Sequence, residues 1–238
     1  MLQHMKKIIN IPINQDILKL IAILTMTIDH LGYIFTPSYE MPLRFIGRIS
    51  FPIFAFLLAY NLTQKDLFKK YITRLTSFAV STSLILIPFK YQIGNVLPLN
   101  IFWTLLLGVI TIYAIEITNK KFKQNNAKYI IIGYILCFSA LLSSITDYEF
   151  FGFLYILSLY SWYKTKHTAF GISTLIISFV MNLHLSVWAS IISCLTSFIF
   201  LLPLTKPAKT IRFLKPWWLF YAYYPVHLAI LYAVKIYY

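Results

Sequence analysis

The feature that most constrains this sequence is a succession of long apolar segments separated by short polar connections. A helix needs about 20 mostly apolar residues to cross a bilayer, where each backbone polar group must be paired within the helix. Such segments recur along the whole chain, so we predict an all-α, polytopic transmembrane helix bundle in one domain, residues 1–238. The predicted spans lie near residues 17–35, 43–62, 72–90, 99–118, 128–146, 149–163, 169–184, 186–204 and 217–235. The sixth is short and the seventh and eighth divide near His184, so eight or ten spans are alternatives to about nine.

The composition excludes a soluble protein. Hydrophobic residues make up 59% of the chain and charged residues only 12%, whereas soluble domains carry about 25% charged residues. A net charge of +14 would favour nucleic-acid binding in a soluble protein. Here the basic residues stand in short clusters between apolar runs, so we expect a lipid bilayer and no nucleic acid as a partner.

The basic residues also predict how the chain is oriented, because cytoplasmic connections of membrane proteins are enriched in Lys and Arg. With nine spans, most of the 21 Lys and Arg residues fall on one side, which predicts a cytoplasmic N-terminus and an external C-terminus. The residues on the predicted cytoplasmic side are Lys6, Lys7, Lys65, Lys69, Lys70, Arg74, Lys120, Lys121, Lys123, Lys128, Lys164, Lys166, Lys206, Lys209, Arg212 and Lys215. The residues on the predicted external side are Arg44, Arg48, Lys90 and Lys235.

Ionisable side chains within a span are informative, because each costs a few kcal/mol unless it is paired or solvated. The first span contains Lys19 near its cytoplasmic end and Asp29 and His30 in its outer half. Adjacent helical residues point about 100° apart, so Asp29 and His30 face different neighbours. Arg44 and Arg48 begin the second span on the same outer side, and we expect one of them to pair with Asp29. This pair is either a structural ion pair joining the two spans or a part of a catalytic site.

Histidine is the residue best suited to chemistry in this setting. Its unperturbed pKa lies close to working pH, so His30 is a candidate general base; a hydrogen-bonded packing role is the alternative. Asn100 begins the fourth span on the outer side and is a further catalytic candidate. Pro225 is expected to kink the last span and to aim a second histidine at a central cavity. The candidate substrate contacts are Tyr33, Trp103, Tyr224 and His227. The pattern of a metal site is absent from the sequence, so we expect no metal.

Several stretches in order along the chain resemble the TraX family, named for a conjugation protein associated with acetylation of the pilin N-terminus. The matching stretches are Leu18–Ala22, Thr25–Gly32, Leu43–Leu58, Tyr71, Arg74–Leu75, Phe78–Ala79, Leu99–Leu105, Gly108, Asp147–Tyr148, Gly152 and Tyr224–Leu228. TraX proteins are in turn similar to a wider group of transmembrane acyltransferases, which share a first-span histidine that takes part in acyl transfer. His30 corresponds to that histidine. The basic stretch Lys69–Arg74 resembles a basic motif at the entrance to the third span of such enzymes. A Ser-Gly pair that often ends their second span is replaced here by Ala59-Tyr60-Asn61.

The resemblance implies a multi-pass acyltransferase of the bacterial cytoplasmic membrane. Acetyl-CoA or another acyl-CoA would be the cytosolic donor, bound by Lys19, Lys69, Lys70 and Arg74. His30 would act as general base, with Asp29 holding the charge arrangement and Arg44, Arg48 or Asn100 stabilising the oxyanion. The acceptor would be an amine or hydroxyl on the outer side, such as a pilin N-terminus or an envelope glycan. An acyl-histidine intermediate is a variant of this mechanism.

Two other classes of function stay open from the sequence. A transporter or channel for a small polar solute is favoured by the charges within the first span, although the chain lacks the clear internal repeat of many transporters. A non-catalytic factor for pilus or envelope assembly is the other alternative.

Overall fold

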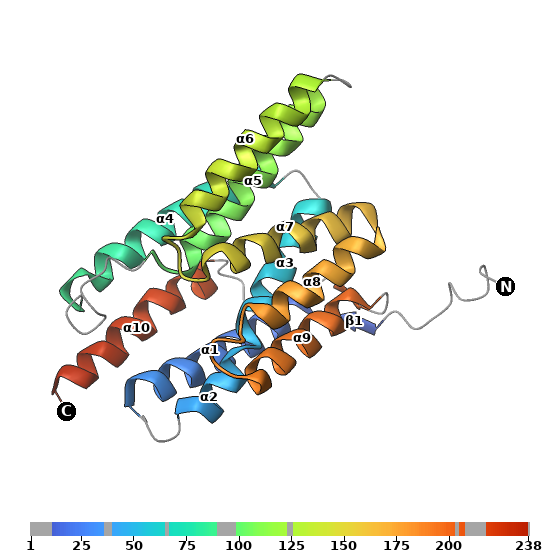
Figure 1. The fold of residues 1–238 in the computed structure, drawn as a ribbon. Helices are drawn as coiled ribbons and strands as arrows, with labels where there is room; N and C mark the ends of the chain where they lie inside the picture. The colour runs from blue at the N-terminus through green and yellow to red at the C-terminus, as the bar shows by residue number, and fades with distance from the viewer. Residues whose placement is uncertain are drawn as a thin grey trace.

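A computed structural model describes residues 11–35, 40–64, 67–89, 99–122, 126–202, 205–207 and 218–237. The chain forms a bundle of helices with one pair of very short strands (Figure 1). In chain order the elements are β1 (Ile11–Ile13), α1 (Gln15–Phe35), α2 (Glu40–Gly47), α3 (Ser50–Gln64), α4 (Phe68–Leu86), η3 (Ile87–Phe89), α5 (Ile101–Lys121), α6 (Asn126–Ser143), α7 (Glu149–Thr165), α8 (Thr168–Val180), α9 (Val187–Leu201), β2 (Thr205–Pro207) and α10 (Leu219–Tyr237).

Helices occupy each of the segments that the apolar runs predict, and the predicted helical class is confirmed. The predicted division near His184 is a turn between α8 and α9. The predicted second span is interrupted by a turn at residues 48–49, which separates α2 from α3. The sequence did not predict β1 and β2, which pair in parallel and join the chain before α1 to the connection between α9 and α10.

The lengths of the helices bear on the number of spans. Among the described residues, 6 helices are long and apolar enough to cross a membrane, which indicates a membrane protein. They are Gln15–Phe35, Pro42–Gln64, Phe68–Phe89, Ile101–Lys121, Asn126–Ser143 and Leu219–Tyr237. The remaining helices α7, α8 and α9 have 17, 13 and 15 residues. At about 1.5 Å per residue, α8 is shorter than the hydrocarbon core of about 30 Å. Spanning by these three helices stays a prediction.

The helices close into a ring. Each helix in the order α1, α3, α7, α5, α4 and α10 contacts the next, and α10 contacts α1 again. The short helix α7 is part of this ring, and its central side chains Tyr155, Ile156 and Leu159 show no exposure. Helices α8 and α9 pack outside the ring against α7 and α3. Helix α6 lies beside α5 (Figure 1) and exposes Tyr134, Phe138 and Leu141, as expected for a surface that faces lipid.

Side-chain contacts establish how neighbouring helices run. Lys19 lies over Phe220 and His30 bonds His227, so α1 and α10 are parallel. Gln15 bonds Asn61 at one end while Asp29 bonds Arg48 at the other, so α1 and α3 are antiparallel. Nine consecutive spans predict the same two relations, since the first and last would be parallel and the first and second antiparallel.

We call the end of the bundle that holds the starts of α1, α4 and α10 and the ends of α3, α5 and α7 the basic end. Its described basic side chains are Lys19, Lys69, Lys70, Arg74, Lys120, Lys121, Lys128, Lys164 and Lys166, whereas the opposite end has Arg44, Arg48 and Lys235. The side of the membrane that each end faces stays a prediction. Lys206 lies in β2, and the chain's other basic residues Lys6, Lys7, Lys65, Lys90, Lys123, Lys209, Arg212 and Lys215 lie outside the described residues.

Candidate active site

An ion pair joins α1 to the α2–α3 turn near the opposite end of the bundle. The Arg48 Nη2 donates to both carboxylate oxygens of Asp29 at 2.9 Å, and its Nε donates to the Arg44 carbonyl at 3.2 Å. The side chains of Arg48 and Asp29 are 7% and 14% exposed. The close approach requires Gly47, because a Cβ there would lie 2.4 Å from the Asp29 Cβ. The predicted pairing of Asp29 with an arginine is therefore present.

Arg44 approaches the same carboxylate less closely. Its Nε lies 3.8 Å from the Asp29 Oδ1, and its guanidinium lies over the ring of Tyr33 at 5.3 Å. The Arg44 side chain is 20% exposed, nearly three times the exposed fraction of Arg48. The predicted contact residue Tyr33 thus borders the more accessible of the two guanidinium groups.

The connection between α6 and α7 completes this charged cluster. Asp147 and Tyr148 interact electrostatically with Arg48, and Asp147 also interacts with Asp29 and Arg44. Tyr148 stacks on Phe51 with ring centroids 4.0 Å apart. Burial raises the pKa of the Tyr148 hydroxyl from 10.0 to about 12, so this hydroxyl keeps its proton beside the charged cluster even at alkaline pH.

His30 contacts α10 and also interacts electrostatically with Arg48 and Arg44. Its Nδ1 lies 2.7 Å from the Nε2 of His227, and the His227 Nδ1 lies 2.9 Å from the carbonyl oxygen of Tyr223. One turn earlier in α1, Thr27 Oγ1 lies 2.7 Å from the Tyr223 hydroxyl. The predicted difference in facing between Asp29 and His30 is thus observed, and it divides the polar groups of α1 between two helix contacts. The predicted residue Tyr224 borders the same pair, 6.1 Å from His30 between ring centroids.

Asn100 and Trp103 have a different setting from the one expected. The Asn100 side chain caps α5 by accepting from the Phe102 backbone N–H, and its amide donates to the Ala79 carbonyl and to Ser83 Oγ at 3.1 and 3.2 Å. The Trp103 indole donates to the same Ser83 Oγ. Both side chains therefore join α5 to α4. Because the Asn100 amide is occupied by these partners, it is a weaker candidate for the oxyanion than Arg44 is.

The predicted donor-binding residues divide into two groups at the basic end. Lys19 pairs with Asp16 at 2.8 Å and lies over Phe220 at 4.9 Å, and Arg74 interacts with Tyr221. Lys69 and Lys70, in contrast, are exposed at the start of α4. The first two residues therefore hold α1 and α4 against α10, while the two lysines at the start of α4 face the surroundings.

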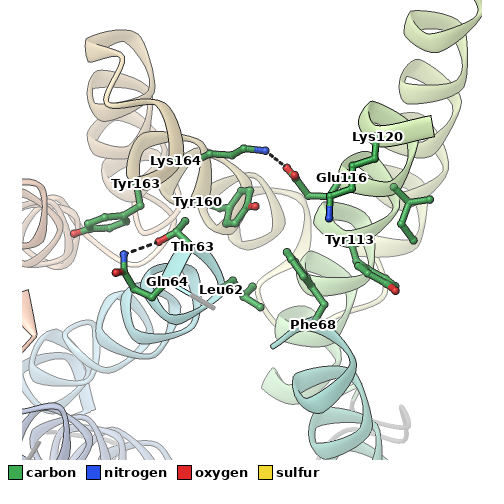
Figure 2. A pocket seen from close by; sticks show the side chains of 11 residues that line it. Leu62, Thr63, Gln64, Phe68, Tyr113, Glu116, Lys120, Tyr160, Tyr163 and Lys164 are labelled. Carbon is green, nitrogen blue, oxygen red and sulfur yellow. Dashed lines mark hydrogen bonds and ion pairs between the residues drawn. The ribbon is translucent and has the colours of Figure 1, made fainter. Parts of the chain in front are cut away.

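A cavity of about 380 Å³ opens between α3, α4, α5 and α7 at the same end (Figure 2). Glu116 and Lys164 form an ion pair across its rim, and Figure 2 shows Lys120 one turn beyond Glu116 on α5. Phe68, which directly precedes Lys69, also lines it. The complete lining is Leu62, Thr63, Gln64, Phe68, Tyr113, Glu116, Ile117, Lys120, Tyr160, Tyr163 and Lys164. This cavity cannot be recognised in the sequence, because residues of four separate segments build it.

Within the described part of the chain, the His, Cys, Asp and Glu side chains form no group of three that would hold a metal ion. The candidate site comprises a charged cluster around Asp29, a histidine pair, and a cavity bordered by basic residues at the far end.

Comparisons with known proteins place these observations in context. The sequence model of the family described as TraX protein matches residues 14–235, nearly the whole chain. An uncharacterised protein of Rickettsia prowazekii (strain Madrid E) is 32% identical over 123 residues, which are 51% of this chain and 46% of that protein. The matched region thus spans about half the length of this relative. No solved structure matches the chain.

Proposed function

This chain belongs to the TraX family, and we propose that it is an acyltransferase of the bacterial cytoplasmic membrane. It would transfer an acyl group, acetyl in the first instance, from acyl-CoA at the basic end to an amine or hydroxyl at the opposite end. The single observation that carries the proposal is His30. It is a partly buried histidine held within a membrane-spanning helix, next in the chain to a carboxylate that binds two arginines.

The roles of the residues follow from their chemistry. His30 removes the proton of the acceptor amine or hydroxyl, and the nucleophile attacks the thioester carbonyl carbon. The Arg44 guanidinium supplies charge for the oxyanion, because Arg48 is occupied by two hydrogen bonds to Asp29. Asp29 keeps both arginines in place rather than contacting the substrate. Attack by His30 itself, with an acyl-histidine intermediate, is the variant mechanism.

The donor would bind at the basic end, which is cytoplasmic in this proposal. Coenzyme A carries phosphates and an aromatic base, which suit lysine side chains and aromatic rings respectively. The exposed Lys69, Lys70 and Lys120 would contact the phosphates, and the cavity residues Tyr113 and Tyr160 would contact the base. Lys19 and Arg74 would shape this entrance through their contacts with α10 rather than bind phosphate.

The acceptor is proposed from the family. TraX proteins are associated with acetylation of pilin during conjugation, so a pilin N-terminus is the first acceptor to test and an envelope glycan the second. Asp147, in the connection between α6 and α7 at the opposite end, would favour the approach of an ammonium group in an otherwise basic protein.

Mass spectrometry of envelope proteins and glycans tests this proposal in cells. Cells that produce the unaltered chain are compared with cells that produce His30→Ala, with equal amounts of each protein in the membrane. We expect an acetyl mass on at least one envelope molecule in the first sample and its loss in the second. Identical acyl profiles in the two samples would exclude His30 as a catalytic residue.

A further inference from the structure

His227 is held in one orientation by its own helix. Its Nδ1 lies 2.9 Å from the backbone carbonyl oxygen of Tyr223, one turn earlier in α10. A carbonyl oxygen only accepts hydrogen bonds, so the proton of this bond belongs to the His227 Nδ1. A neutral imidazole has a single N–H group, and the other nitrogen, Nε2, is therefore an acceptor.

That acceptor faces His30. The distance from the His227 Nε2 to the His30 Nδ1 is 2.7 Å. The ring centroids lie 5.0 Å apart and the ring planes differ by 20°, so the two rings lie edge to edge and close to one plane. This is the arrangement that a hydrogen bond between ring nitrogens requires. Because the His227 Nε2 accepts, the His30 Nδ1 donates, and the His30 Nε2 is left without a proton.

We infer that His227 is a positioning residue that keeps His30 in the tautomer protonated at Nδ1, so that Nε2 is the nitrogen that takes up a proton. The tautomer of a histidine is set by the bond that its other nitrogen makes. The catalytic part of this inference rests on the proposed acyltransferase function, because only there does the His30 Nε2 have a proton to receive. It replaces the substrate contact that the sequence suggested for His227.

The surroundings of His227 restrict rotation of its ring. The ring is buried and stacks on Tyr223 at 4.9 Å between centroids, with Tyr224 against its edge at 5.7 Å. Thr27 Oγ1 donates to the Ile23 carbonyl at 2.8 Å, so the Tyr223 hydroxyl donates the 2.7 Å bond to Thr27. Tyr223, whose carbonyl holds the His227 ring, is thus itself bound to α1. A turn of the His227 ring would break contacts with both helices.

The proton balance of the transfer shows where His227 acts. The acceptor N–H or O–H proton moves to the His30 Nε2 while the acceptor atom bonds to the thioester carbonyl carbon. When the tetrahedral intermediate collapses, the C–S bond breaks and the proton passes from Nε2 to the thiolate sulfur. Between these steps His30 is a cation, and its Nδ1–H bond to His227 becomes charge-assisted and stronger. His227 therefore stabilises the charged form of His30 without touching the substrate.

Nitrogen NMR of the histidine side chains tests the tautomer directly. The full chain is produced with ¹⁵N-histidine and placed in lipid nanodiscs, and His30 is assigned by the signals that vanish in His30→Gln. We expect the His30 proton on Nδ1 in the unaltered protein. In His227→Ala we expect it to move to Nε2 or to divide between both nitrogens. A His30 proton on Nε2 in the unaltered protein would overturn the inference.

Kinetic measurements on the same preparations test the catalytic part. His227→Ala is expected to lower kcat about 10- to 100-fold, the range seen when the hydrogen-bond partner that orients a metal-binding histidine is removed, while KM for the donor changes little. His227→Gln keeps a carbonyl oxygen as an acceptor for the His30 Nδ1, so it is expected to recover most of this loss. His184→Gln removes an exposed histidine at the α8–α9 turn and is the matched control, with unchanged kcat.

The outcomes separate this inference from the proposed function. If the unaltered protein transfers no acyl group, the proposed function fails, and the NMR measurement alone still decides the tautomer. If the unaltered protein is active and His227→Ala retains its full kcat, the positioning role is wrong while the acyltransferase function stands. If His227→Ala does not fold, the NMR measurement on the unaltered protein still tests the tautomer of His30. The kcat of His227→Gln then tests the effect of His227 on catalysis.

Discussion

Two faces of α1 differ in what their polar residues are used for. On one face Asp29 binds Arg48 at 2.9 Å, and both side chains are largely buried. On the other face His30 binds a neutral partner, His227, that is fixed by its own helix. A buried charge pair is costly to break, because the remaining charge loses its bonded partner, whereas breaking a pair of neutral histidines leaves no buried charge. We therefore expect the first face to govern stability and the second to govern chemistry.

His30→Ala is expected to have the largest effect on activity. Loss of a general base costs about 10²–10⁴-fold in rate, and loss of the nucleophile in the variant mechanism costs at least as much. Acyl transfer by the purified protein in nanodiscs measures it. The midpoint of thermal unfolding is expected to stay near that of the unaltered protein, since His30 is only partly buried. A large fall in stability would remove the distinction between the two faces.

Asp29→Ala is expected to have the largest effect on stability. It leaves the buried Arg48 guanidinium without its carboxylate, which costs about 3–5 kcal/mol in comparable pairs. Thermal unfolding in detergent, followed by the fraction of protein that stays monodisperse, measures the loss. Asp29→Asn, which keeps an acceptor oxygen for Arg48, is expected to lose less. If Asp29→Ala had unaltered stability and no activity, Asp29 would belong to the chemistry instead.

Gly47→Ala sharpens the same comparison with a smaller change. The added Cβ would lie 2.4 Å from the Asp29 Cβ, so α1 and the α2–α3 turn must move apart. Overpacking of this kind costs about 1–3 kcal/mol. Gly133→Ala in α6 is the matched control, because its Cβ would meet nothing within 4 Å. The thermal midpoint should fall for Gly47→Ala alone, and an equal response in both variants would contradict the packing seen here.

Lys120→Gln is expected to have the smallest effect. It removes one exposed positive charge from the cavity at the basic end, and single exposed charges contribute about 1 kcal/mol or less. We expect KM for acyl-CoA to rise a few-fold with kcat unchanged, and the difference from the unaltered protein to shrink at high salt. Lys235→Gln, at the far end of α10, should leave KM as it is. If both substitutions changed KM equally, the cavity would not be the site that binds the donor.

The sequence was sufficient for features that depend on one helix at a time. Apolar runs located the helical segments of the described residues except for the break between α2 and α3, and the helical repeat predicted that Asp29 and His30 face different neighbours. The Asp29–Arg48 pair was also predictable, because the two helices are consecutive and a carboxylate in a membrane needs a cation.

Features that depend on which helices meet were not predictable from the sequence. His30 and His227 are 197 residues apart, and periodicity does not reveal that the last helix closes the ring against the first. The position of Asn100 at the start of a span fits both a polar site and a helix cap, and the structure gives it the partners of a cap. Lys19 and Arg74 contact Phe220 and Tyr221 of α10, and the sequence does not predict which helices are neighbours of α10.

The most direct test of the account measures acyl transfer across a reconstituted membrane. The purified chain is placed in sealed liposomes with labelled acetyl-CoA on one side only and a peptide carrying a pilin-type N-terminus on the other. Side-specific proteolysis first establishes which end of the bundle each side meets. The account predicts label on the peptide when the donor is at the basic end, no label with the donor at the opposite end, and none with His30→Ala. Acetyl-CoA or its label crossing the membrane without reaching the peptide, equally in the unaltered protein and in His30→Ala, would contradict it.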